Sequence, residues 1–286
     1  MSYKASKKIN TPEFVGMTIM RIFMILLSVC SLYPILFILF TSMKSRNEFY
    51  QSVWALPSRF NIGNYVDAIV SGHIGEYFIN SIIITGISLI FILIFSILSA
   101  YGLSRLHVPG CELILLLLFV CQMLPQEAML IPLYVVSSKY GLFQIPYIST
   151  IIPYIGWTLA GSIVMLKMFF DTFPQEIVEA ARIDGCTELQ TMIRVVAPTM
   201  KPSICTVMML AFCGCWGELM WAKQSTLLTD KGITITVGLL RFQGANSTDW
   251  GMLTAAVIII IIPLLIVFCF TQKYLVAGFT GGAVKG

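Results

Sequence analysis

The sequence predicts an all-α integral membrane protein with six transmembrane helices. Hydrophobic residues make up 57% of the 286 residues and charged residues only 11%, and the mean hydropathy is +0.87. These values lie outside the range of soluble globular domains. Apolar runs recur along the chain, each long enough to cross a hydrocarbon core, which takes about 20 helical residues. One polar segment, Pro174–Pro202, interrupts them.

The runs form a single membrane domain, residues 1–286, and cover residues 17–40, 79–103, 113–136, 150–170, 203–221 and 253–271. The first run is too long for the core of a signal peptide and lacks a small-residue cleavage pattern, so it should remain as an anchor. Lys4, Lys7 and Lys8 precede it, and basic residues favour the cytoplasmic side. We therefore expect the tails, residues 1–16 and 272–286, to be cytoplasmic. Two longer outer loops also carry basic residues, but they contain acids as well.

The chain offers no catalytic constellation and no metal site of its own. Its only histidines, His73 and His107, lie in opposite loops, which excludes a His-rich metal centre or a Ser/His/Asp arrangement. The eight cysteines fall in spans or predicted cytoplasmic loops, where a disulfide framework is not expected. No GxxxxGK[ST] phosphate loop occurs, so the chain cannot cradle a nucleotide by itself.

The polar segment Pro174–Pro202, which we call the polar island, has the signals of two short helices. Thr172 and Pro174 predict the first helix start, and Gly185 predicts its end, because glycine adopts the left-handed conformation at little cost. Thr187 and Gln190 have the spacing of a capping box that begins a second helix. The expected apolar faces are Ile177, Ala180, Ala181 and Asp184 on the first helix, and Leu189, Met192, Ile193 and Val196 on the second. Pro198 and Pro202 are expected to end the second helix.

Within the island, EAARIDG followed by a valine pair and Pro198 closely resembles the EAA loop of permease subunits of ATP-binding-cassette importers. Ala197 stands where that pattern usually has leucine. The resemblance implies a type I importer permease fold, in which a cytoplasmic coupling helix sits in a cleft of a partner ATPase. The residues it assigns to this coupling role are Glu179, Ala180, Ala181, Asp184, Gly185 and Pro198.

Two further segments resemble the second permease subunit of maltose-type carbohydrate importers: PQEAMLIPLYVVSSKYGLFQ and the end of the chain with its GGAVKG tail. The resemblance implies a second permease as heterodimer partner, two ATP-binding subunits that hold ATP and Mg²⁺, and an extracytoplasmic sugar-binding protein. It implies no cofactor on this chain and no nucleic acid. In that family the tail reaches the ATPase dimer, which here would involve Gly282, Ala283, Val284 and Lys285.

Polar residues in the third and fifth runs are candidates for the translocation path. Gln122, Gln126 and Glu127 flank Pro125, and a broken helix at membrane depth is tolerated only beside protein or a watery cavity. A proline kink packed against neighbouring helices is the alternative. Glu218 lies in an apolar run, where a carboxylate is costly and usually faces the interior. A structural Glu218 is as well supported as a substrate contact, and Gly217 stands where the family pattern has asparagine.

The segment Thr226–Trp250 is a long outer loop of the kind often used in binding. In the resembled family this loop enters the binding protein, and the candidates here are Gly238, Arg241 and Gly244. The resemblance also implies a bacterial or archaeal cell membrane. The alternatives are an importer permease for a non-sugar solute and a secondary transporter, which would need inverted repeats that the sequence does not show.

Overall fold

The computed structural model describes residues 11–242 and 248–283, with side chains for 15–242 and 248–275, and the described part is helical almost throughout. Four helices are long and apolar enough to cross a membrane, and two bent helix pairs raise the number to as many as six if each pair is one span. The all-α membrane fold predicted from composition is therefore confirmed.

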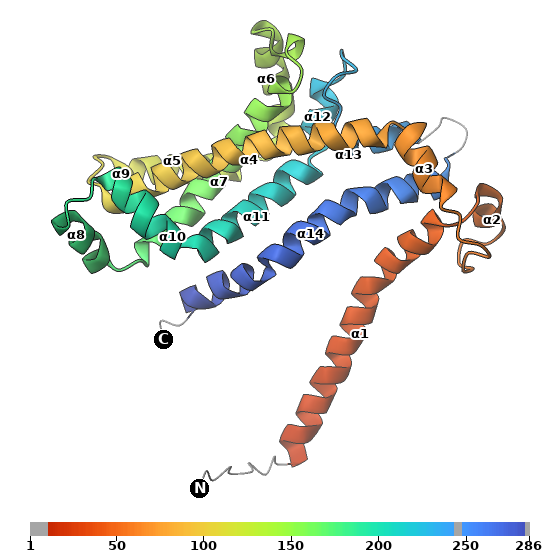
Figure 1. Cartoon of the computed structure of the whole chain (residues 1–286), viewed down its shortest axis with the longest axis horizontal. Coiled ribbons are helices and arrows are strands. Elements are labelled where there is room, and N and C mark those ends of the chain that lie inside the picture. Colours follow the sequence, from red (N-terminus) through yellow and green to blue (C-terminus); the bar gives the residue numbers. More distant parts are fainter. Residues whose placement is uncertain (1–10, 243–247, 284–286) are drawn as a thin grey trace.

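The long helices are α1 (Thr11–Ser42), α4 (Ile74–Arg105), α7 (Ile148–Asp171), α11 (Lys201–Gly217) and α14 (Trp250–Ala283). Helices α4, α7, α11 and α14 form a bundle, with α4 against α7 and α11 against α14. Helix α1 contacts α14 and then diverges from the bundle (Figure 1). Most of its length is exposed in this chain, and only its C-terminal end is buried, so lipid or another subunit must cover the rest.

Helix breaks explain why apolar length alone does not describe the third and fifth runs. Helices α5 (Cys111–Met123) and α6 (Gln126–Lys139) meet at 98°. The proline at position 125 lies in this break, where its ring and its missing N–H end the first helix. Helix α11 ends at Gly217 and is followed by α12 (Met220–Ser225). Both α6 and α12 project from the side of the bundle (Figure 1).

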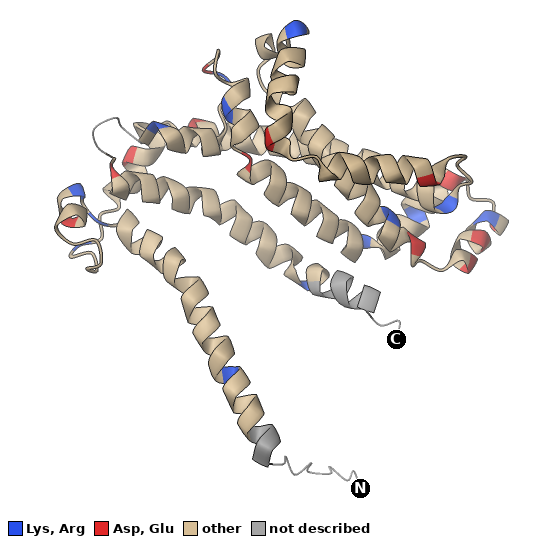
Figure 2. Ribbon diagram, turned by 180° about the vertical axis from the view of Figure 1, so that it is seen from behind, with Lys and Arg blue, Asp and Glu red and all other residues tan. Residues whose placement is uncertain are grey.

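Short helices occupy the two ends of the bundle. Helices α8 (Gln175–Ile183), α9 (Glu188–Thr191) and α10 (Ala197–Thr199) lie at one end, with a π-helical turn, η2 (Met192–Val196), between α9 and α10. Helices α2 (Arg46–Gln51), α3 (Gly63–Val70) and α13 (Ile235–Leu239) lie at the other, with 3₁₀ turns η1 (Leu142–Gln144) and η3 (Leu240–Phe242) in the connections. Charged residues gather at these ends and on the projecting α6 and α12, and are sparse along the long helices in between (Figure 2), as membrane-embedded helices require.

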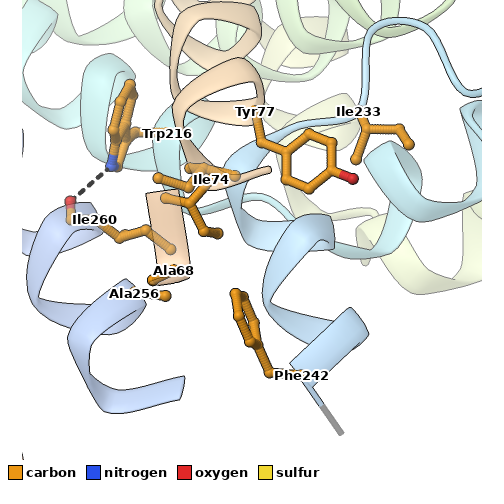
Figure 3. Close-up of a cluster of buried hydrophobic side chains, with 9 residues drawn as sticks. Ala68, Ile74, Tyr77, Trp216, Ile233, Phe242, Ala256 and Ile260 are labelled. Atoms are coloured by element: carbon orange, nitrogen blue, oxygen red, sulfur yellow. Dashed lines mark hydrogen bonds between the residues drawn. The ribbon is translucent and has the colours of Figure 1, made fainter. Parts of the chain in front are cut away.

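The buried core consists of separate clusters along the bundle. At the α13 end, Ile74, Tyr77, Trp216 and Ile235 pack together, and the indole N–H of Trp216 donates to the carbonyl of Ile260 at 3.1 Å (Figure 3). This bond satisfies a donor that would be costly to bury unpaired in an apolar environment. It also joins α11 to α14.

The first and last helices are longer than the predicted spans and extend into the predicted tails. Helix α1 already begins at Thr11, and α14 continues through Ala283, beyond the expected end of the last run at residue 271. Each helix therefore extends past its apolar stretch into the polar boundary. Continuing the backbone hydrogen-bond ladder leaves fewer unpaired groups near the bilayer surface than breaking it there.

Candidate functional site

The polar island folds as a helix, a tight glycine turn and a second helix. Gly185 has φ +83°, in the left-handed region, directly after α8. Thr187 and Gln190 form the predicted capping box, in which each side chain bonds the backbone N–H of the other residue. One part of the prediction was wrong: Thr172 does not cap α8, because its hydroxyl donates to the carbonyl of Phe169 at 2.7 Å.

The second helix of the island does not end at Pro198, contrary to the prediction. Helix α9 continues through the π-turn η2 and α10 to Thr199, so Pro198 lies inside the helical segment and does not end it. A proline ring normally clashes with the carbonyl four residues earlier. The wider π-turn lets the N–H of Ala197 reach the carbonyl of Met192 instead, which leaves room for Pro198. The chain then bends by 83° into α11, with Pro202 in its first turn.

One apolar side of the island packs against the end of the bundle. Val178, Met192 and Val196 are buried against Tyr101 of α4 and Phe170 of α7. Of the residues expected to share the apolar face of α8, only Ala181 is buried, together with Val178; Ile177, Ala180 and Asp184 are exposed. The exposed face includes most of the predicted coupling residues: Glu179, Ala180, Asp184, Gly185 and Pro198.

Arg105, the last residue of α4, joins that helix to the start of the island. Its guanidinium donates to the carbonyls of Phe170 and Phe173 and, at 2.7 Å, to the side-chain oxygen of Gln175. The same group lies 5.9 Å from the centroid of the Phe173 ring. A planar guanidinium can satisfy several acceptors at once in this way. The sequence suggested only a basic residue on the cytoplasmic side, because its acceptors are distant in the chain.

A second polar contact joins α4 to the other half of the island. The hydroxyl of Tyr101 donates to Glu188 at 2.8 Å, and Nε of Arg182 donates to the same carboxylate at 2.7 Å. The hydrogen bond from Arg182 lowers the pKa of the Glu188 carboxyl. Glu188 thus links α8, α9 and α4. With Arg105, this contact ties the island rigidly to a transmembrane helix.

The broken third span lines a cavity of about 540 Å³ between α5, α7 and α11. Gln122 and Gln126 lie in its wall together with Trp157 and Thr158, whereas Glu127 does not. The sequence did not single out Trp157, because an aromatic residue within an apolar run carries no distinct signal.

Glu218 lies at the break between α11 and α12, and both of its carboxylate oxygens accept hydrogen bonds. Its carboxylate accepts from the backbone N–H groups of Trp221 and Ala222 at 2.8 and 2.9 Å, and from the hydroxyl of Tyr154 at 3.0 Å. The carboxylate thereby accepts from two of the first amides of α12, which have no partner within the helix. These contacts favour a structural role for Glu218 over a substrate contact. Glu218 also does not lie in the wall of the 540 Å³ cavity.

Replacing Glu218 by alanine should lower the free energy of unfolding by about 2–3 kcal/mol, because buried donors lose a charged acceptor. Thermal unfolding of the detergent-purified protein measures this. Glu127→Ala, at an exposed carboxylate, is the control and should leave the melting temperature unchanged. Equal stability of the two variants would contradict the structural role.

The candidate binding residues of the outer loop have different surroundings in the structure. Gly238 is buried, and a Cβ at this position would lie 2.2 Å from the Tyr77 ring, so it packs against α4 instead of presenting a binding surface. Arg241 is accessible and pairs with Asp230 at 3.2 Å. Gly244 lies outside the described residues. At the other end of the chain, Gly282 and Ala283 belong to α14, while Val284 and Lys285 also lie outside the described residues.

Comparison with known proteins agrees with this arrangement. Residues 92–280 match the family described as "Binding-protein-dependent transport system inner membrane component". The probable ABC transporter permease protein YurM of Bacillus subtilis is 33% identical over 96% of this chain and 90% of its own length. The trehalose/maltose transport system permease protein MalG of Thermococcus litoralis is 32% identical over 92% of this chain and 94% of its own.

A solved structure has the same fold. It is a chain of a bacterial ABC transporter involved in the import of the acidic polysaccharide alginate, with a TM-score of 0.78, 23% identity, and coverage of 93% of this chain and 98% of that one. The family match covers more than half of the chain. This protein therefore belongs to the binding-protein-dependent inner-membrane components, the permease subunits of ABC importers.

Proposed function

We propose that this chain is one of two different permease subunits in an ATP-driven carbohydrate importer, and that its polar island docks on a partner ATPase. The observation that carries the proposal is the outer surface of the island. Large apolar side chains there remain exposed, including Ile177, Ile183, Leu189 and Ile193, with Ile183 86% exposed. Outside the spans, a cluster of this kind marks a protein interface.

The attachment of the island explains how such docking would act on the membrane. The island is fastened to α4 by Arg105 and by the Tyr101–Glu188 bond, and to α7 by buried apolar contacts. Closure of the ATPases would then move α8 and the bundle together as a rigid body, which is one established route to switching. ATP and Mg²⁺ would be held entirely by the partner.

The orientation proposed from charge places this end in the cytoplasm. Arg105, Lys167, Arg182, Arg194 and Lys201 all lie at the island end, and basic residues in short loops favour that side. The opposite end, with α2, α3 and α13, would face the extracytoplasmic binding protein. The carbohydrate substrate is supported by the sugar-import name of the MalG relative and by the sequence motifs shared with the maltose-type permeases.

Affinity purification from native membranes in mild detergent tests the proposal. We expect an ATPase with a phosphate-binding loop and a second permease to co-purify, and ATP hydrolysis to rise when a sugar-loaded binding protein is added. A homodimer with uptake driven by an ion gradient would contradict it in favour of a secondary transporter. Stimulation by a non-sugar solute alone would contradict the carbohydrate assignment.

A further inference from the structure

The 540 Å³ cavity beside the broken third span has a wall of unusual chemistry for a transmembrane region. It lies against the middle of α7, at Gly156, Trp157, Thr158, Gly161 and Ser162, and against one face of α11 that includes Gly214. Its volume falls in the range of small-molecule sites, about 300–1,000 Å³. Glycines supply much of this space, since a Cβ at Gly156 or Gly214 would meet no atom within 4 Å.

Polar groups in the wall lack partners. Among the described residues, neither the carboxamide of Gln122 nor that of Gln126 forms a hydrogen bond, and the indole N–H of Trp157 forms none. The Gln122 amide nitrogen would lie only 3.1 Å from a Cβ at Gly161, so it rests directly against the α7 backbone. Both carboxamides are exposed in this chain, and an amide within a membrane-spanning region needs hydrogen-bond partners. A solute, water or the partner permease must supply them.

The wall contains no charged residue. An ion or an acidic solute would be left without a counter-charge in a weakly solvated space, whereas carboxamides both donate and accept hydrogen bonds. An aromatic ring also offers a flat apolar surface. A neutral sugar has matching features, because its hydroxyls donate and accept while its C–H faces are apolar.

We propose that this chain itself holds a neutral sugar in the cavity during passage, with Gln122 and Gln126 bonding hydroxyls and Trp157 facing a ring. The proposal rests on the proposed carbohydrate import and extends it. It makes Gln122 and Trp157 determinants of substrate specificity, and it places a sugar contact on this subunit in addition to any on the partner permease.

Transport per ATP hydrolysed tests the site, because a binding protein sets the apparent affinity for sugar. The complete complex would be reconstituted in liposomes with ¹⁴C-labelled maltose, trehalose and raffinose as probes. Gln122→Met removes the hydrogen-bonding groups at similar length and should lower sugar uptake per ATP about fivefold, the equivalent of about 1 kcal/mol. Gln122→Asn keeps the amide and should restore part of the loss.

A second variant fills the cavity. Gly214→Leu should reduce uptake per ATP by more than about tenfold, because the side chain occupies the solute's space. Gly86→Leu is the matched control: a Cβ there also meets no atom within 4 Å, but Gly86 lies on α4 outside the cavity. Unchanged uptake per ATP in Gln122→Met and Gly214→Leu would overturn the proposal.

Thiol labelling of the wild-type complex gives a readout that does not depend on a variant assembling. Cys121 lies in the cavity wall, whereas Cys213 is exposed on α11 but is not part of that wall. A methanethiosulfonate reagent should label Cys121 more slowly during turnover with a transported sugar, and label Cys213 equally in both conditions. Equal labelling of Cys121 contradicts the site. No uptake of any probe by the wild-type complex contradicts the proposed import instead.

Discussion

A Gly185→Asp substitution is expected to abolish sugar uptake while membrane insertion and the amount of folded protein remain normal. Gly185 has φ +83°, and a side chain in this conformation costs up to about 1–2 kcal/mol. A Cβ would meet no atom of this chain within 4 Å, so the fold itself has room for it. A large loss of transport would therefore come from the surface that docks against the glycine turn.

Two matched variants separate charge from shape at this turn. Gly185→Asn has nearly the shape of aspartate without its charge, and asparagine tolerates the left-handed conformation. Gly110→Asp places the same charge at another left-handed glycine (φ +74°), where a Cβ also meets no atom within 4 Å and which lies outside the island. ATP hydrolysis, sugar uptake and co-purification of the ATPase are measured for each. Wild-type uptake by Gly185→Asp would remove the coupling role from the turn.

An Arg105→Gln substitution is expected to separate the island from α4. It leaves the carbonyls of Phe170 and Phe173 without their charged donor, which costs about 3 kcal/mol when groups are partly buried. We expect the purified protein to unfold at a lower temperature. We also expect ATP hydrolysis to continue with uptake reduced about tenfold or more, since the motion of α8 no longer reaches the bundle intact.

Arg105→Lys and Lys167→Met serve as controls for this prediction. Lysine keeps the charge but lacks the fork that reaches several acceptors, so an intermediate loss is expected. Lys167 pairs with Asp171 at 2.6 Å on the surface, and a surface ion pair contributes at most about 1 kcal/mol. If Lys167→Met reduced coupling as much as Arg105→Gln, a general loss of positive charge at this end would explain both.

Local sequence signals predicted the structure correctly where it depends on residues that are close together in the sequence. The capping box of Thr187 and Gln190, the glycine turn at Gly185 and the break near Pro125 all depend on backbone geometry within a few residues. Each was predicted correctly. The local pattern did not indicate that Val178 is buried on α8 while Ile177 is exposed, because this depends on packing against Phe170 of another helix.

The membrane class, the helical content and the position of the polar island could be predicted before the structure, because hydropathy and backbone propensity act locally along the chain. The contacts of Arg105 and Glu218, and the position of Trp157 in the cavity wall, depend on tertiary packing. Arg105 finds its acceptors 65 or more residues away, and the carboxylate of Glu218 is satisfied partly by Tyr154 on another helix. Such contacts depend on how helices distant in sequence pack side by side, which no local pattern encodes.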